Sequence, residues 1–101
     1  MVNIHSESAD RLFQAILHLR TTEECYAFFE DLCTIKEIQD MAQRLDTAVL
    51  LLQGLSYQKI TEQVNISSAT IGRVNKCIHY GSGGYELAIQ RLAETETRND
   101  G

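Results

Sequence analysis

The side chains best suited to chemistry with a partner are hydroxyl and basic groups gathered between positions 56 and 79, in the segment SYQKITEQVNISSATIGRVNKCIH. Short hydroxyl side chains at the start of a helix can hydrogen-bond to the edges of DNA bases. Basic, phenolic and amide side chains can contact phosphate oxygens. Both kinds in one short segment indicate recognition of double-stranded DNA rather than catalysis.

Two sets of candidate DNA-binding residues follow. The base-reading set is expected at the start of the second helix of this segment, where water can bridge short side chains to the bases: Ser67, Ser68, Ala69 and Thr70. One of the two serines is expected only to cap the helix. The phosphate-contacting set is Tyr57, Gln58, Lys59, Arg73 and Lys76.

A helix, a tight turn and a second helix must position these side chains. Ile60 and Val64 lie four residues apart on one helical face, and Ser56 is a good N-cap. Asn65 follows, and asparagine tolerates the left-handed conformation that a sharp helix exit needs. Apolar residues at 60, 64, 66, 71 and 74 match helix-turn-helix spacing. Any two packed helices can show that spacing, so plain packing stays open as the alternative.

The net charge of −5 argues against binding to nucleic acid, but the distribution of the charges along the chain does not. Residues 1–54 carry four basic and nine acidic side chains, and residues 81–101 carry two basic and four acidic ones. Residues 55–80 carry three basic side chains against Glu62. The helix-turn-helix is thus the positive part of the chain, and a local field is what meets a phosphate backbone. Because the surplus is only two charges, a single chain should bind DNA weakly.

Composition and spacing narrow the class of protein. No run approaches the about 18 apolar residues of a membrane span, and the N-terminus lacks the order of a signal peptide, so we expect a cytoplasmic protein without membrane contact. Cysteines at 25, 33 and 77 include no CxxC pair, which favours buried thiols over a disulfide or a zinc site. Histidines at 5, 18 and 79 show no metal-ligand spacing, and no serine or cysteine stands in a nucleophile context. Neither catalytic nor metal-binding residues are predicted.

The predicted fold is all-α with six helices. Residues 1–8 are expected to be flexible, 9–94 to form one helix-turn-helix domain, and 95–101 to form a flexible tail. The first helix should start from a cap at Ser8 or Asp10 and run to about Leu19, and the second should start at Thr22. The other predicted signals are a capping box of Thr34 and Glu37 on the third helix, a C-terminal Gly54, a GSGGY connector, and a last helix from Tyr85 to about Glu94. The helices carry more apolar surface than one thin layer could cover, which favours a homodimer.

This order of elements resembles the Trp repressor superfamily. A long helix ends in LLQG, and a helix-turn-helix with ATIGRV is followed by a glycine-containing linker and a short helix. The segments EECYAFFEDLCTIKEIQDMAQR and ATIGRVNKCIHYGSGGYE resemble its TrpR-like YerC/YecD branch. The resemblance implies an intertwined homodimer whose helix-turn-helix pairs project as two DNA-reading heads, with a function in repressing transcription.

The resemblance also implies a pocket for a small-molecule corepressor, formed by Thr34, Arg44, Thr70, Arg73 and Cys77. Cys77 stands where the family has a hydroxyl contact, and the turn before the helix-turn-helix is one residue shorter, so tryptophan is not the expected effector. Two arginines could clamp an anion, but Arg44 could instead pair with Asp40 or Asp46, and Arg73 could face phosphate. Apart from such a corepressor, no cofactor is predicted. The alternative function is a dimeric protein-interaction module that has kept the fold and lost DNA binding, and the net charge of −5 is its main support.

Overall fold

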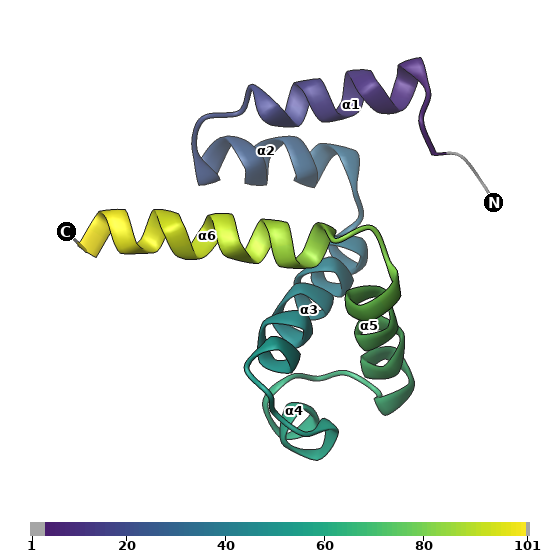
Figure 1. The fold of residues 1–101 in the computed structure, drawn as a ribbon. Helices are drawn as coiled ribbons and strands as arrows, with labels where there is room; N and C mark the ends of the chain where they lie inside the picture. The colour runs from purple at the N-terminus through teal and green to yellow at the C-terminus, as the bar shows by residue number, and fades with distance from the viewer. Residues whose placement is uncertain (1–3, 101) are drawn as a thin grey trace. The chain divides into compact units, whose positions relative to one another are not determined.

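The computed structural model describes residues 4–100, with side chains for residues 4–95. Within that range six helices and no strand occur (Figure 1), which confirms the predicted all-α fold. The helices are α1 (Glu7–Leu17), α2 (Thr22–Leu32), α3 (Ile35–Leu52), α4 (Tyr57–Gln63), α5 (Ser68–Tyr80) and α6 (Gly84–Asp100). In the described part of the chain, no helix is long and apolar enough to cross a lipid bilayer.

The chain divides into two compact units, residues 1–38 and residues 39–101, and each is described by itself. The predicted single domain over 9–94, with flexible segments 1–8 and 95–101, stays a prediction, and residues 1–3, residue 101 and the side chains of 96–100 lie outside the described part. The predicted end of the last helix near Glu94 is wrong, because α6 is helical to Asp100. No glycine or proline interrupts that stretch, and the Thr95 hydroxyl donates to the Arg91 carbonyl within the helix.

Helix starts in the first unit are set by hydroxyl caps; α1 starts earlier than predicted, whereas α2 starts at Thr22 as predicted. Ser6, rather than Ser8 or Asp10, caps α1 and accepts a hydrogen bond from the Ala9 amide at 3.0 Å. Thr21 caps α2 and accepts from the Glu24 amide at 3.1 Å. Both caps have extended backbone, which places the hydroxyl over the first helical turn. The first helix also ends at Leu17, two residues before the predicted end.

The first unit has almost no interior. No side chain of α1 or α2 is buried, although Phe28 and Phe29 pack edge to face with ring centroids 5.6 Å apart. Large apolar side chains remain exposed, among them Leu17 at 72% and Tyr26 at 62%. The cysteines at 25 and 33 are half-buried and Cys77 is exposed, so the prediction of three buried thiols is wrong. These helices lack the neighbouring side chains that would enclose them.

Helix α3 begins and ends as the sequence predicts. The Thr34 amide donates to Glu37 Oε1 at 2.8 Å and the Glu37 amide donates to Thr34 Oγ1 at 3.1 Å, which is a capping box. At the other end Gly54 adopts a left-handed φ of 88°. The Leu55 amide donates to the Leu50 carbonyl and the Gly54 amide to the Leu51 carbonyl, the two bonds of a Schellman motif.

The second unit contains the buried core, which consists of Thr47 and Ala48 from α3, Ile60 from α4, and Ile71 and Val74 from α5. The Thr47 hydroxyl donates to the Gln43 carbonyl at 2.8 Å, so its burial leaves no polar group unpaired. Helix α5 packs against both α4 and α6. This small core fixes the helix-turn-helix within the second unit.

The GSGGY connector turns the chain between α5 and α6, as predicted. Gly81 ends α5, and its amide donates to the Cys77 carbonyl at 2.8 Å. A Cβ atom at Gly81 would clash with that same carbonyl oxygen. Gly83 then adopts a left-handed φ of 82°, and α6 starts one residue before the predicted Tyr85.

Candidate nucleic-acid interface

Helices α4 and α5 are joined by a short extended turn. Ser56 caps α4 and accepts a hydrogen bond from the Lys59 amide at 3.2 Å. The helix ends at Val64, which has φ −123° and ψ 135°. The Ile66 amide donates to the Val64 carbonyl at 2.9 Å. The predicted left-handed Asn65 is wrong: no described residue other than glycine has a positive φ. The helix ends at the extended Val64, and the Ile66–Val64 hydrogen bond closes a three-residue turn centred on Asn65.

The two serines at the start of α5 differ in role. Ser67 is the cap: its Oγ accepts from the Thr70 amide at 3.2 Å and lies 3.0 Å from Thr70 Oγ1. Thr70 is half-buried. Because the two hydroxyls bond to each other, they are less available to a base edge than the exposed Ser68 and Ala69 are. Within the predicted base-reading set, Ser68 and Ala69 are therefore the strongest candidates for contacts to bases.

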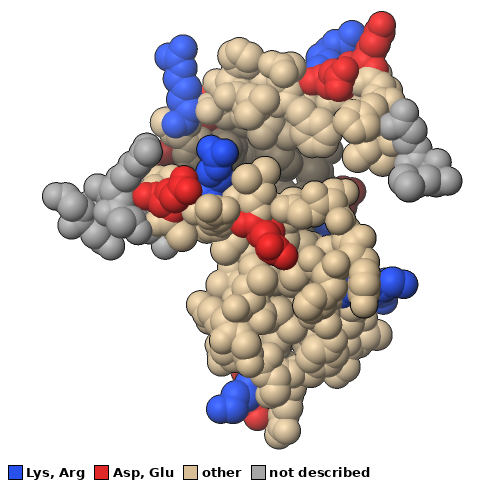
Figure 2. Space-filling model, viewed as in Figure 1, with Lys and Arg blue, Asp and Glu red and all other residues tan. Residues whose placement is uncertain are grey.

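The predicted phosphate-contacting residues are all exposed. Tyr57, at 39% exposure, begins α4, followed by Gln58 and Lys59. On α5, Ala69, Arg73 and Lys76 follow one another at spacings of four and three, and so lie on one face. Figure 2 shows a basic side chain beside α5 and another near α4, where acidic atoms adjoin it, with a largely uncharged surface between them.

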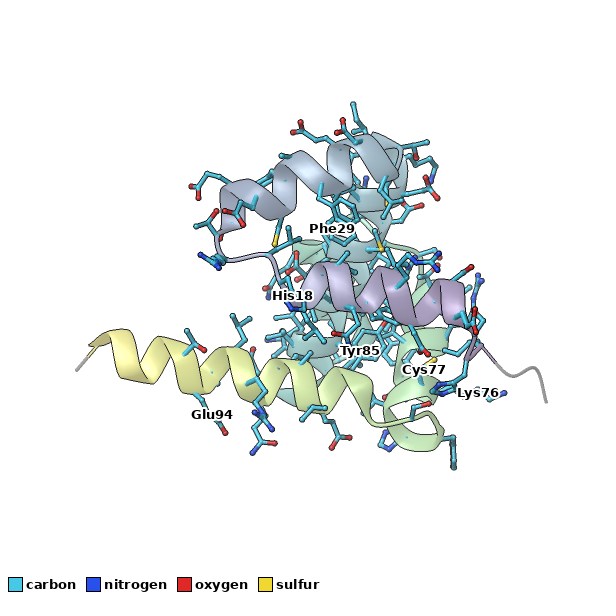
Figure 3. The ribbon with its side chains drawn as sticks, turned by 90° about the horizontal axis from the view of Figure 1, so that it is seen from above. His18, Phe29, Lys76, Cys77, Tyr85 and Glu94 are labelled. Carbon is cyan, nitrogen blue, oxygen red and sulfur yellow. The ribbon has the colours of Figure 1, made fainter. Side chains whose placement is uncertain are left out.

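This exposed face of α5 lies opposite the core. Ile71 and Val74, which point to the other side of the helix, are 0% and 2% exposed. Lys76 and Cys77 are neighbours on α5 and both are exposed (Figure 3). One side of α5 thus holds the second unit together while the other is free to meet a partner, as a recognition helix requires.

The residues expected to hold an effector are only partly brought together. Thr70, Arg73 and Cys77 follow one another along α5 at spacings of three and four. Arg44 is exposed on α3, in the same unit. Thr34 belongs to the first unit, where its hydroxyl accepts the Glu37 amide in the capping box. In this structure, therefore, Thr34 serves the start of a helix.

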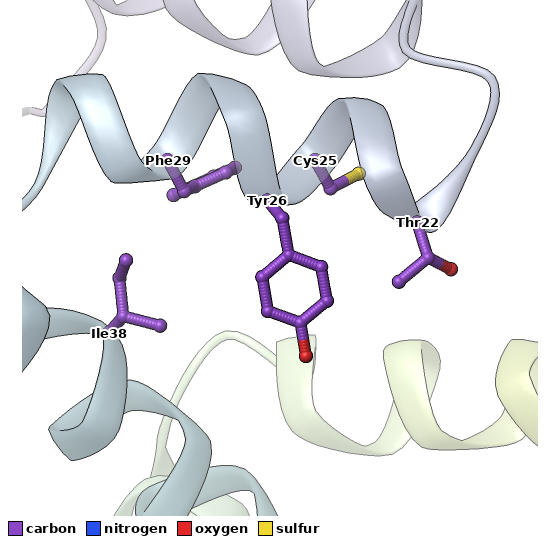
Figure 4. A pocket seen from close by; sticks show the side chains of 5 residues that line it. All are labelled: Thr22, Cys25, Tyr26, Phe29 and Ile38. Atoms are coloured by element: carbon purple, nitrogen blue, oxygen red, sulfur yellow. The ribbon is translucent and has the colours of Figure 1, made fainter.

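The first unit contains a hollow that sequence reasoning did not single out. It has a volume of about 280 Å³ and is lined by Thr22, Cys25, Tyr26, Phe29 and Ile38 (Figure 4). The signal in the sequence is the group of aromatic side chains in α2, which includes Tyr26 and Phe29. None of the five expected effector residues lines it, and no charged side chain does. Such a wall suits an apolar side chain better than an anion.

Comparison with known proteins gives consistent results. The family described as Trp repressor protein matches residues 7–93. The chain is 49% identical over 96 residues to the uncharacterized protein YerC of Bacillus subtilis strain 168, covering 95% of this chain and 92% of YerC. Its structure is similar to that of a TrpR-like protein from Eubacterium eligens ATCC 27750, with a TM-score of 0.86, 42% identity, and 89% and 93% of the two chains covered. A proposed Trp repressor from Staphylococcus aureus matches with a TM-score of 0.85, 41% identity and coverage of 89% and 90%.

Proposed function

The chain belongs to the Trp repressor protein family, and from this membership and the surface of α5 we propose that it is a sequence-specific DNA-binding regulator of transcription, acting as a homodimer and as a repressor. The proposal rests on the difference between the buried side and the exposed side of α5. Ile71 and Val74 are buried in the core, while Ser68, Ala69 and two cationic side chains are exposed. The matched family is one of regulators, not of enzymes.

In the proposed complex, the N-terminal turn of α5 enters the major groove. Ser68 and Ala69 are short, so the helix can approach the bases closely, and ordered water can complete their contacts. Lys59 on α4 and Arg73 and Lys76 on α5 contact phosphates and set the orientation of the helix. Hydroxyl groups do not specify one base strongly. Much of the specificity should therefore come from the spacing of two half-sites.

Charge makes a second copy necessary for useful affinity. Residues 55–80 carry a surplus of only two positive charges in a chain of net charge −5. Two heads double the number of phosphate contacts and read half-sites about one helical turn apart. Since nearly all non-specific affinity comes from released counterions, binding should fall steeply with salt.

An effector, where one acts, should be an anion. Arg44 and Arg73 both present exposed guanidinium groups in the second unit, and guanidinium binds carboxylate or phosphate in a bidentate manner. Cys77 provides only a weak hydrogen-bonding group, which disfavours a ligand that needs a hydroxyl partner there. Tryptophan is for that reason not the proposed effector.

The test is capture of sheared genomic DNA by the purified protein at two salt concentrations, followed by sequencing. We expect fragments that share a palindrome. Arg73→Ala and Lys76→Ala should weaken binding to all fragments and each reduce the salt slope by about one contact. Arg91→Ala removes the same charge from α6 and should bind as the wild type does. Recovery of no DNA at either salt would contradict the proposal and favour a protein-interaction module.

A further inference from the structure

Gly72, in the middle of α5, has no explanation within the described fold. Glycine in a helix interior is less stable than alanine because it loses more backbone freedom on folding. Three other glycines are needed where they stand: Gly54 and Gly83 have positive φ, and a Cβ at Gly81 would clash with the Cys77 carbonyl. At Gly72 the φ angle is not positive, and a Cβ would meet no atom within 4 Å. The cost in helix stability is therefore not offset by any contact within the described chain.

The place of Gly72 on α5 indicates what it serves. It lies four residues after Ser68, three after Ala69 and four before Lys76, so these four residues are neighbours on the helix surface. Val74 is buried on the opposite side of the helix, and the buried Ile71 lies about 100° around the helix from Gly72. Gly72 itself is half-buried, but the space at its Cβ position is open and lies on the flank of α5 that also carries Lys76.

A small-molecule effector fits the open space beside Gly72 less well than DNA does. At 3.6 residues per turn, Thr70 and Cys77 lie about 160° and about 140° around the helix from Gly72, in the same sense. A small molecule held by Thr70 and Cys77 would therefore lie on the other flank of α5. The flank of Gly72 carries Lys76, whose ammonium group suits a polyanion.

We propose that Gly72 is the position at which the backbone of α5 comes closest to DNA, and that the duplex occupies the space which a Cβ atom would take. This inference rests on the proposed function and deepens it. Without a side chain at position 72, a DNA strand can reach van der Waals contact with the helix backbone between Ala69 and Lys76. Gly72 is then a determinant of affinity, although it offers no side-chain hydrogen bond.

The test compares Gly72→Ala and Gly72→Leu with the wild type in the full-length protein. The matched control is Gly84→Ala, because a Cβ at Gly84 would also meet no atom within 4 Å and its φ is not positive, but it begins α6. Fluorescence anisotropy measures binding at low salt to two duplexes, one of mixed sequence and one captured from genomic DNA by the wild type. Thermal unfolding of each variant checks the fold.

Gly72→Ala should melt at or above the wild-type temperature, because alanine favours the helix. It should bind DNA roughly tenfold more weakly, as expected for a close contact overfilled by one methyl group. Gly72→Leu should bind more weakly still, and Gly84→Ala should bind as the wild type does. Equal loss on both duplexes would place the sugar-phosphate backbone at Gly72, and loss on the captured duplex alone would place base edges there; either supports the inference.

Three results would overturn it. Wild-type affinity in Gly72→Ala would show that DNA does not approach this position. A lower melting temperature for Gly72→Ala would show that the fold itself needs the glycine. If the wild type captures no genomic DNA, and neither it nor Gly84→Ala binds the duplex of mixed sequence, the proposed function is overturned and this inference with it. The inactive wild type distinguishes this result from the first one.

Discussion

Hydroxyl side chains start five of the six described helices, at Ser6, Thr21, Thr34, Ser56 and Ser67. Each accepts a hydrogen bond from the amide three residues on, which stabilises a helix by about 1 kcal/mol. Because this signal is local, the sequence predicts it well. The predicted cap is misplaced where another hydroxyl stands nearby, as with Ser6 and Ser8.

The capping box at the start of α3 predicts a pH dependence of stability. Hydrogen bonds from the Thr34 backbone amide, and then from its side chain, hold the pKa of Glu37 below its ordinary value of 4.5. The folded state thus favours the carboxylate, so this stabilisation is complete above about pH 4.5 and is lost as the pH falls through the lowered pKa. Glu37→Gln keeps an acceptor but cannot ionise, so its free energy of unfolding should fall less steeply below pH 4.5.

Urea denaturation followed by circular dichroism across this acid range measures the difference. Glu62→Gln, which removes a carboxylate near the end of α4, is the control and should keep the wild-type slope. An unchanged slope in Glu37→Gln would mean that the hydrogen bonds of the box do not depend on the charge.

At the scale of the elements, the connection between α5 and α6 is set by one glycine. A Cβ at Gly81 would meet the Cys77 carbonyl, which already accepts the Gly81 amide, so the backbone has to move. We expect Gly81→Ala to lower the free energy of unfolding by about 1–3 kcal/mol. Gly84→Ala, where the space is open, should leave it unchanged or raise it. Equal stability of the two variants in urea titrations would contradict this account.

The elements also show how far the sequence predicts this protein. Apolar periodicity gives α3 to α5 and their core, because Ile60, Ile71 and Val74 recur at helical spacing. It does not give the conformation of Asn65, which is the centre of a three-residue turn without a positive φ. The polar composition of the tail predicted an end of the last helix near Glu94, whereas the uninterrupted backbone continues to Asp100.

The sequence likewise predicts only part of the candidate site. The exposed cations of α5 and a capping serine follow from residue type and spacing. The hydrogen bond between the Ser67 and Thr70 hydroxyls does not follow from the sequence, because it depends on side-chain rotamers. The role of Gly72 could not be found either, because an interior helix glycine is meaningful only once the space around its Cβ position is known.

At the scale of the whole molecule, the first unit exposes the apolar surface that a folded chain normally hides. None of the side chains of α1 or α2 is buried, and Phe13 and Leu17 are 53% and 72% exposed. The apolar hollow beside Tyr26 and Phe29 is likewise open. Exposed apolar surface on this scale usually marks an interface. A second copy of the chain, the commonest partner for such a surface, is the proposed occupant.

Leu17→Asp should therefore weaken self-association, because burying an unpaired carboxylate in an apolar interface is costly. Sedimentation velocity should give the wild type twice the chain mass of 11.4 kDa and shift Leu17→Asp toward a single chain. Gln14→Asp adds the same charge to α1 at another exposed position and should stay paired. The wild type should also melt at a higher temperature as its concentration rises, because dissociation accompanies unfolding. A wild type that sediments as a single chain at every concentration would contradict the homodimer. It would also contradict the proposal that two helix-turn-helix heads bind two half-sites.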